Sequence, residues 1–264
     1  MSSLRMRWHV TAAAGVTCAL AIALHVAGRP PGRNVGRGPG IACVLPPRTC
    51  AERCDELVEM PLVGFGYVDV RVAEESLPAT STSYLRRDLM MLVQYAAAKV
   101  ACKAATWNTG IGGPIALGDM SERDGSTPGT LWGMPRHPPN THVDGLALDI
   151  AYFQRDTPDN HMRPICPHVW RGRERWHCVA PPTRLDAWRT ALFIGAFLEE
   201  PRIRVIGIDG RAAKPILAAF DELCATRWIE PAACRRHKIE FETRAAGHGW
   251  FYGHHNHLHV AWNR

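Results

Sequence analysis

HVDGLALDIA (residues 142–151) and GHHNHLHVAW (residues 253–262) are the two stretches that decide the fold of this chain. In both, apolar residues alternate with polar or small ones, the pattern of a strand with one buried face. The residues that share the apolar faces are Leu146, Leu148 and Ile150 in the first stretch and Leu258, Val260 and Trp262 in the second. We expect the two stretches to be neighbouring strands of one antiparallel sheet, with their polar residues gathered on the opposite face.

Imidazole and carboxylate groups fall on that opposite face. Asp149, His257 and His259 lie on the non-core side of the two strands, and His142 opens the first stretch. Three nitrogen or oxygen ligands with an open fourth position are typical of catalytic zinc sites. We therefore expect His142, Asp149 and His259 to bind one Zn²⁺ ion, with His257 beside it as general base or transition-state stabiliser. The alternative is that these are ordinary polar residues in a chain with thirteen histidines.

Further polar and aromatic residues are candidates for contact with a substrate. Asp119 and Ser121 would orient a substrate or support the metal ligands, although a turn that caps its own backbone explains them nearly as well. Trp250 and the two aromatic residues after it would form a wall for a peptide, with buried packing as the alternative. We expect His248 and His255 to lie in solvent.

The N-terminal part indicates export. Arg5 and Arg7 precede an uncharged apolar stretch, so residues 1–28 are expected to be a signal peptide or an uncleaved signal anchor. Residues 29–80 would form a linker and a cysteine-bearing extension, and residues 81–264 the catalytic domain. The predicted location is the periplasm or the outside of the cell.

The cysteines support an exported protein. One of the nine lies in the apolar N-terminal stretch, which leaves an even number and no Cys-x-x-Cys pair. We expect disulfides, with Cys166–Cys178 and Cys224–Cys234 as local bridges. The remaining four would pair among themselves: Cys43, Cys50, Cys54 and Cys102.

The net charge of the chain bears on which classes of partner it could bind. A net charge of +6 suits nucleic acid, anionic lipid or the anionic cell wall. The basic residues are scattered, however, and export argues against a nucleic-acid partner. We expect contact with a membrane only through an uncleaved N-terminal anchor. No Gly-x-Ser-x-Gly elbow and no phosphate-binding loop are present, which argues against serine hydrolase and nucleotide chemistry.

Periodicity predicts the remaining elements. Residues 83–106 are expected to form a helix whose start is capped by the Ser-Thr-Ser run before it. Residues 186–200 and 212–225 are predicted helices, and residues 204–208 a short strand. We expect residues 154–182 to form an irregular region, dense in Pro, Arg and His and clipped by one disulfide, with a simple surface insertion as the alternative to a functional role.

Taken together, the motifs resemble the zinc peptidase superfamily that includes lysostaphin-type endopeptidases, D-alanyl-D-alanine carboxypeptidases and the hedgehog signalling domain. Its pattern is a His, six residues, an Asp and a later His-x-His. Within it the chain is most similar to the penicillin-insensitive murein endopeptidases over residues 84–260. Three segments occur in that family's order: GDMS (118–121), EPRIRVIGI (200–208) and GHHNHLH (253–259).

The resemblance implies an α+β fold around a small central antiparallel sheet flanked by helices. It also implies that His142, Asp149 and His259 bind zinc, that His257 is catalytic, and that His254 borders the site. The implied reaction is cleavage of the amide between D-alanine and diaminopimelate in the peptide stems of crosslinked peptidoglycan.

The chain departs from the family in three places. One is the irregular cysteine-bearing region at residues 154–182, which would reshape the substrate groove. Pro139 replaces a family histidine, with His137 as the nearest substitute, and Ala147 replaces an aspartate, as in the carboxypeptidase branch. Two rivals therefore stay open. One is a D,D-carboxypeptidase or dipeptidase with the same metal site, and the other is a non-catalytic extracellular module that binds zinc.

Overall fold

A central sheet runs through the computed structural model, which describes residues 43–73, 82–107, 112–131, 134–135, 137–157, 159–242 and 252–263. The strands in chain order are β1 (Leu57–Glu59), β2 (Val63–Gly64), β3 (Tyr67–Asp69), β4 (Tyr84–Arg86), β5 (Ile115–Leu117), β6 (Thr130–Leu131), β7 (Met134–Pro135), β8 (Ala147–Ala151), β9 (Val169–Trp170), β10 (Arg173–Glu174), β11 (Ile203–Gly207), β12 (Phe241–Glu242) and β13 (His257–Trp262). The helices are α1 (Val70–Ala73), α2 (Arg87–Lys103), the 3-10 turn η1 (Val143–Gly145), α3 (Ala187–Leu198), α4 (Gly210–Ala225) and α5 (Pro231–Glu240).

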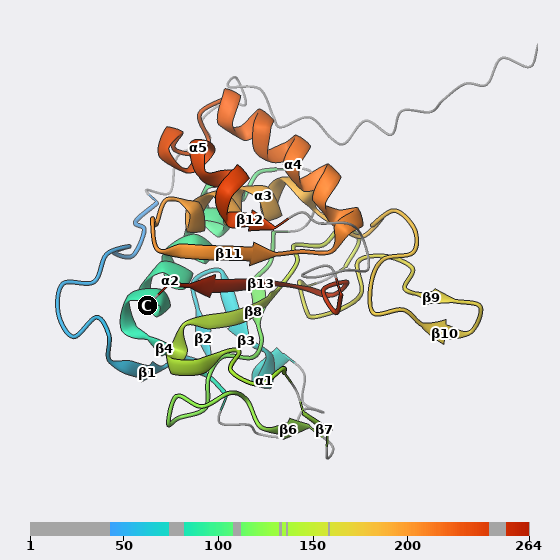
Figure 1. Ribbon diagram of the computed structural model, residues 1–264. Coiled ribbons are helices and arrows are strands. Elements are labelled where there is room, and N and C mark those ends of the chain that lie inside the picture. The colour runs from blue at the N-terminus through green and yellow to red at the C-terminus, as the bar shows by residue number, and fades with distance from the viewer. Residues whose placement is uncertain are drawn as a thin grey trace, which may run out of the picture.

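Seven of these strands form the sheet, in the order β12-β11-β13-β8-β5-β3-β2 (Figure 1). The α+β class expected from the sequence is thus confirmed, but the sheet is larger than expected. It is also mixed, because β3 pairs with β5 and β11 with β12 in parallel, while the other pairings are antiparallel. The central pair, β8 and β13, is antiparallel as predicted.

The core lies on one face of this pair. Leu148 and Ile150 of β8 and Leu258 and Val260 of β13 are fully buried, in one cluster with the apolar residues of α2 and α3. Helix α3 is buried along its whole length and packs against α2, α4 and α5. Because the apolar residues alternate, the opposite face of β8 and β13 is left to Asp149 and the histidines.

Most of the predicted elements have the expected type. The helices expected at 186–200 and 212–225 are α3 and α4, and the strand expected at 204–208 is β11. The predicted cap of α2 is wrong. The Tyr84–Arg86 segment pairs with β1, the helix starts only at Arg87, and the hydroxyl of Ser83 donates to Asp69 instead.

Disulfides hold the loops as expected. Cys166–Cys178 and Cys224–Cys234 form the predicted local bridges, and the other four cysteines pair as Cys43–Cys102 and Cys50–Cys54. The expected signal segment, residues 1–28, and the glycine- and proline-rich start of the linker lie outside the described residues. Among the described residues, no helix has the length and apolar character to cross a bilayer.

Candidate metal centre

The register of β8 against β13 places a histidine directly across from an aspartate. His259 pairs with Asp149, and the neighbouring pairs on the same face each include an alanine. Nδ1 of His259 lies 2.8 Å from Oδ1 of Asp149, and both residues are buried. The small flanking side chains leave room above the strands, so this polar pair faces an open space rather than packed side chains.

His142 joins this pair from the turn before β8. Its backbone is in the left-handed region, with φ at 55°, and η1 follows at once. The turn brings Nε2 of His142 to 3.5 Å from Oδ1 of Asp149, and the rings of His142 and His259 lie 4.7 Å apart between centroids. The three residues expected to bind metal therefore lie together.

Gly145 makes this turn possible. Its φ is +64°, and a Cβ at this position would lie 2.5 Å from the backbone nitrogen of Arg86. A side chain is thus disfavoured both by backbone conformation and by lack of space. The glycine lets the chain pass close to β4 and return as β8, which sets the position of His142 over Asp149.

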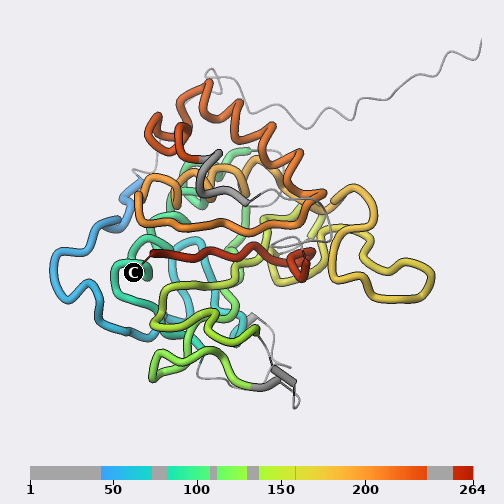
Figure 2. The backbone as a smooth tube through the Cα atoms, viewed as in Figure 1, coloured from blue at the N-terminus to red at the C-terminus, as the bar shows by residue number. Residues whose placement is uncertain are grey.

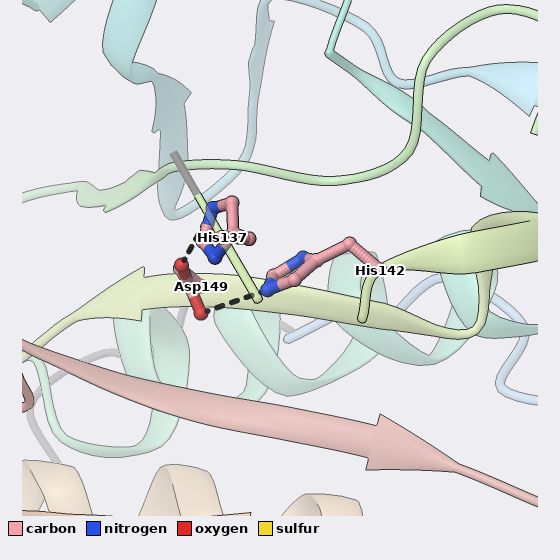
Figure 3. Close-up of side chains that lie close together, drawn as sticks. All are labelled: His137, His142 and Asp149. Carbon is pink, nitrogen blue, oxygen red and sulfur yellow. Dashed lines mark ion pairs between the residues drawn. The ribbon is translucent and has the colours of Figure 1, made fainter. Parts of the chain in front are cut away.

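His137 extends the cluster from the preceding loop (Figure 3). Its Nε2 lies 2.8 Å from Oδ2 of Asp119 and 3.7 Å from Oδ2 of Asp149, and its ring is 4.1 Å from that of His142. The family resemblance suggested His137 only as a substitute for a missing histidine. Its loop position carries no periodicity, so no local pattern places it at the site.

His257 and His254 border the other side of Asp149. Nε2 of His257 lies 3.7 Å from Oδ2 of Asp149, and its Nδ1 is 2.8 Å from Oδ1 of Asn256. The ring of His254 is 4.8 Å from that of His257, and Nδ1 of His254 lies 2.8 Å from the carbonyl oxygen of Tyr252. His257 therefore lies beside the aspartate, and His254 lies beside His257, with its ring 6.2 Å from that of His259.

Burial sets the charge of these groups. It lowers the pKa of His142 to about 3 and that of His254 to about 3, and it also lowers the pKa of His257. Burial opposes ionisation of Asp149, but His142, His257 and His259 hold the pKa of its carboxyl well below the ordinary value. At neutral pH His142, His254 and His257 are therefore neutral imidazoles near the Asp149 carboxylate, and a neutral imidazole keeps a lone pair for a cation.

Asp119 and Ser121, two of the residues expected to contact a substrate, have different surroundings. Asp119 supports the cluster, since its carboxylate contacts His137 and accepts a hydrogen bond from Thr82. Ser121 is fully buried, and its hydroxyl donates to the backbone carbonyls of Tyr84 and Glu122. These bonds match the alternative explanation of Ser121, a residue that caps the backbone of its own turn. Direct contact of Ser121 with a substrate stays a prediction.

Other expectations concern the segment before β13. Trp250, the aromatic residue after it and His248 lie outside the described residues, while Tyr252 is exposed. The expectation that His255 lies in solvent is wrong, because only 6% of its surface is exposed. The rings of His168 and Trp176, on either side of the β9–β10 hairpin, lie 4.9 and 6.3 Å from its ring, and the local sequence does not predict these contacts.

A cavity of about 740 Å³ opens along this face of the sheet. Its lining includes His142, His259, Arg204 of β11 and Trp262 of β13. Ala147 and Ala261 also line it, and they belong to a small apolar cluster separate from the core. The polar cluster therefore has access to a groove of the size that holds a small ligand or a peptide.

The donor set fits a divalent cation. His137, His142 and Asp149 offer ligand atoms within 4.8 Å of one another, and His259 contacts the same carboxylate. Both ring nitrogens of His142 are buried, and neither makes a hydrogen bond with a described residue. A buried polar atom without a partner is costly, and a cation held by two imidazoles and a carboxylate removes that cost.

Comparison with known proteins adds no assignment: no family model matches this chain, and no curated protein matches it either.

Proposed function

We propose that this chain is a zinc metallopeptidase, secreted or periplasmic, that hydrolyses the peptide crosslinks of bacterial peptidoglycan at the amide between D-alanine and diaminopimelate. The observation that carries the proposal is His142, a buried imidazole with no hydrogen-bond partner among the described residues, beside the ionised Asp149 at a solvent-accessible groove. The sequence pattern shared with murein endopeptidases supplies the substrate class.

His142, Asp149 and His259 are the proposed ligands of one Zn²⁺ ion. His259 is preferred over His137 because a strand fixes it directly opposite Asp149. His137 comes from a loop, and its Nε2 is already 2.8 Å from Asp119. We assign to the His137–Asp119 pair the role of supporting the ligands from the side.

When bound, zinc supplies Lewis-acid polarisation of a carbonyl and acidifies water. The rest of the chemistry falls to the protein. His257 is neutral at pH 7 because burial lowers its pKa, so its Nε2, which faces Asp149, can take a proton from the attacking water and return it to the leaving amine. Asn256 orients this ring through Nδ1.

The groove suits an anionic peptide stem. Arg204 of β11 also lines the cavity, and its guanidinium could pair there with a substrate carboxylate. Ala147 and Ala261 line the cavity with small side chains, and the chain's net charge of +6 favours approach to the anionic wall. Four disulfides agree with an oxidising compartment.

The test is mass spectrometry of purified crosslinked muropeptides after incubation with the protein, with and without a chelator. Conversion of dimers to monomers is expected for the wild type and for His161→Ala, a control histidine outside the cluster. Chelated protein and His259→Ala should leave dimers intact, and zinc content should fall in His259→Ala but not in His161→Ala.

Two results would overturn the assignment in different ways. Release of a terminal D-alanine from intact dimers would make the protein a D,D-carboxypeptidase, in line with Ala147 at the floor of the site. Retained zinc with no product from crosslinked or uncrosslinked peptides would make it a binding module.

A further inference from the structure

A second cluster of metal-ligating side chains lies outside the centre described above. It comprises His168 just before β9, Glu174 on β10, and His255 in the segment that leads into β13. Nδ1 of His168 lies 2.6 Å from Oε2 of Glu174, and the rings of His168 and His255 are 4.9 Å apart. One ligand atom from each residue lies within 4.8 Å of the others.

The hairpin that carries two of these residues is held in shape. The Cys166–Cys178 bridge closes its base, and β9 pairs with β10 in an antiparallel ladder (Figures 1 and 2). Oε1 of Glu174 accepts hydrogen bonds from the backbone N–H groups of Arg175 and Trp176, which leaves Oε2 toward His168. The carboxylate is therefore oriented before any ligand arrives.

His255 is held from the other side, and its ring has an unused nitrogen. The residue's carbonyl accepts a hydrogen bond from the backbone N–H of Ile165, which ties this segment to the base of the hairpin. The residue is 6% exposed, and its Nδ1 is buried without a hydrogen-bond partner among the described residues. Burial and the nearby His168 also lower the pKa of His255 to about 4, so the ring is neutral at physiological pH.

We propose that His168, Glu174 and His255 form a second metal site, which binds a divalent transition ion of the Zn²⁺ class. Two imidazoles and one carboxylate are a donor set that such ions favour. Tetrahedral Zn²⁺ with bonds of about 2.0 Å needs ligand atoms about 3.3 Å apart. The donor atoms lie within 4.8 Å of one another, so each pair is about 1.5 Å or less from that spacing.

The second site links the hairpin to the segment that precedes β13. His255 stands two positions before His257, so an ion held by His168, Glu174 and His255 would fix the chain just before the strand that carries His257 and His259. The backbone N–H of Gly253 already donates to the carbonyl of Trp176, 2.7 Å away. The ion would therefore hold the segment that carries His254 and leads into β13 at His257, whatever reaction the first centre performs.

The experiment uses the whole metal-free protein and Co²⁺, whose visible absorption reports ligation. In a His142→Ala background, which removes a ligand of the first centre, we expect one equivalent of Co²⁺ to bind with a ligand-field spectrum. Adding Glu174→Gln, which keeps the shape and removes the charge, should weaken binding at least tenfold, as should His255→Asn. His161→Ala in the same background is the matched control and should leave the spectrum unchanged.

Far-UV circular dichroism of each variant shows whether the protein is still folded. Glu174→Gln should disturb packing least, because glutamine has nearly the same shape as glutamate. A His142→Ala protein that binds no Co²⁺ would overturn the proposal. Binding that persists undiminished in both the Glu174→Gln and His255→Asn variants would overturn it as well, because the ion would then lie elsewhere.

Discussion

His259 lies directly across from Asp149 in the β8–β13 pair, with Nδ1 of the imidazole 2.8 Å from Oδ1 of the carboxylate. The two residues are 110 positions apart in the chain. Their contact depends on the ladder between the two strands, whose apolar faces are locked into the core. The same alternation that buries the leucines therefore aligns the proposed ligands.

Asp149→Asn should abolish tight zinc binding. The substitution keeps the shape of the side chain but removes the only anionic ligand of the proposed set, so the cation would lose its charge compensation. Metal content of the purified protein, measured by inductively coupled plasma mass spectrometry, should fall by about one equivalent. Asp159→Asn, which alters a pair with Arg163 outside the cluster, is the control and should retain the metal. Equal zinc in both variants would contradict the assignment of Asp149.

His257→Ala should lower kcat by about 10²- to 10⁴-fold, the usual contribution of a placed proton-transfer group. Zinc content should stay at the wild-type level, because His257 is proposed to lie beside the ion and not to bind it. The comparison of kcat with metal content separates this role from ligation. A variant that loses zinc along with activity would show that His257 is itself a ligand.

The metal-free protein should lose stability as the pH falls below 6.5. The pKa of His142 is about 3 in the folded protein and 6.5 for an ordinary histidine, so between these values the unfolded chain binds a proton that the folded chain does not. Two pH units below 6.5, this difference amounts to about 3 kcal/mol for one such histidine. Urea unfolding at several pH values measures it.

The matched comparison for that titration is His142→Asn, which removes the titrating group. The acid-induced loss of unfolding free energy between about pH 6.5 and about pH 4.5 should be smaller in this variant by about 3 kcal/mol, whatever its stability at neutral pH. The same slope in both proteins would mean that His142 does not carry the effect.

Gly145→Ala should destabilise the protein by more than about 2 kcal/mol and weaken metal binding, because the new Cβ would clash with the backbone of Arg86 and shift His142. Gly172→Ala is the control. It also has a positive φ, of 73°, but no described atom lies within 4 Å of the added Cβ. Gly172→Ala should lower the free energy of unfolding by only about 1 kcal/mol, because a residue with a side chain disfavours positive φ. Thermal unfolding and zinc titration compare the two, and equal effects would exclude the clash.

The parts of the fold that the sequence predicts are those with a local pattern. Apolar alternation is visible in β8 and β13, and helical periodicity in α3 and α4, so their types follow from the residues alone. The predicted start of α2 is wrong because pairing of Tyr84 with Glu59 draws the segment into a strand. That pairing depends on a segment about 25 residues earlier, which no local propensity reveals.

In the site, too, the residues on strands can be predicted from a local pattern, and the residues on loops cannot. Asp149, His257 and His259 are placed by strand alternation, so their gathering on one face can be predicted from the sequence. His137 and His255 lie on irregular segments, and their positions depend on which loop folds over them. Cys166 and Cys178, which flank His168 and Glu174, indicate in the sequence that this segment is held by a disulfide. They do not indicate which residues the segment contacts.

β13 follows every other described strand along the chain, yet it lies in the middle of the sheet, between β11 and β8. Until it inserts, both neighbours have an unpaired edge, and Asp149 faces no imidazole from this strand. Closing a ladder between such distant segments costs more chain entropy than closing a local one, so we expect it to close late in folding. On the proposed assignment, the event that completes the sheet would also complete the ligand set. Metal would then bind only a chain whose central sheet is complete.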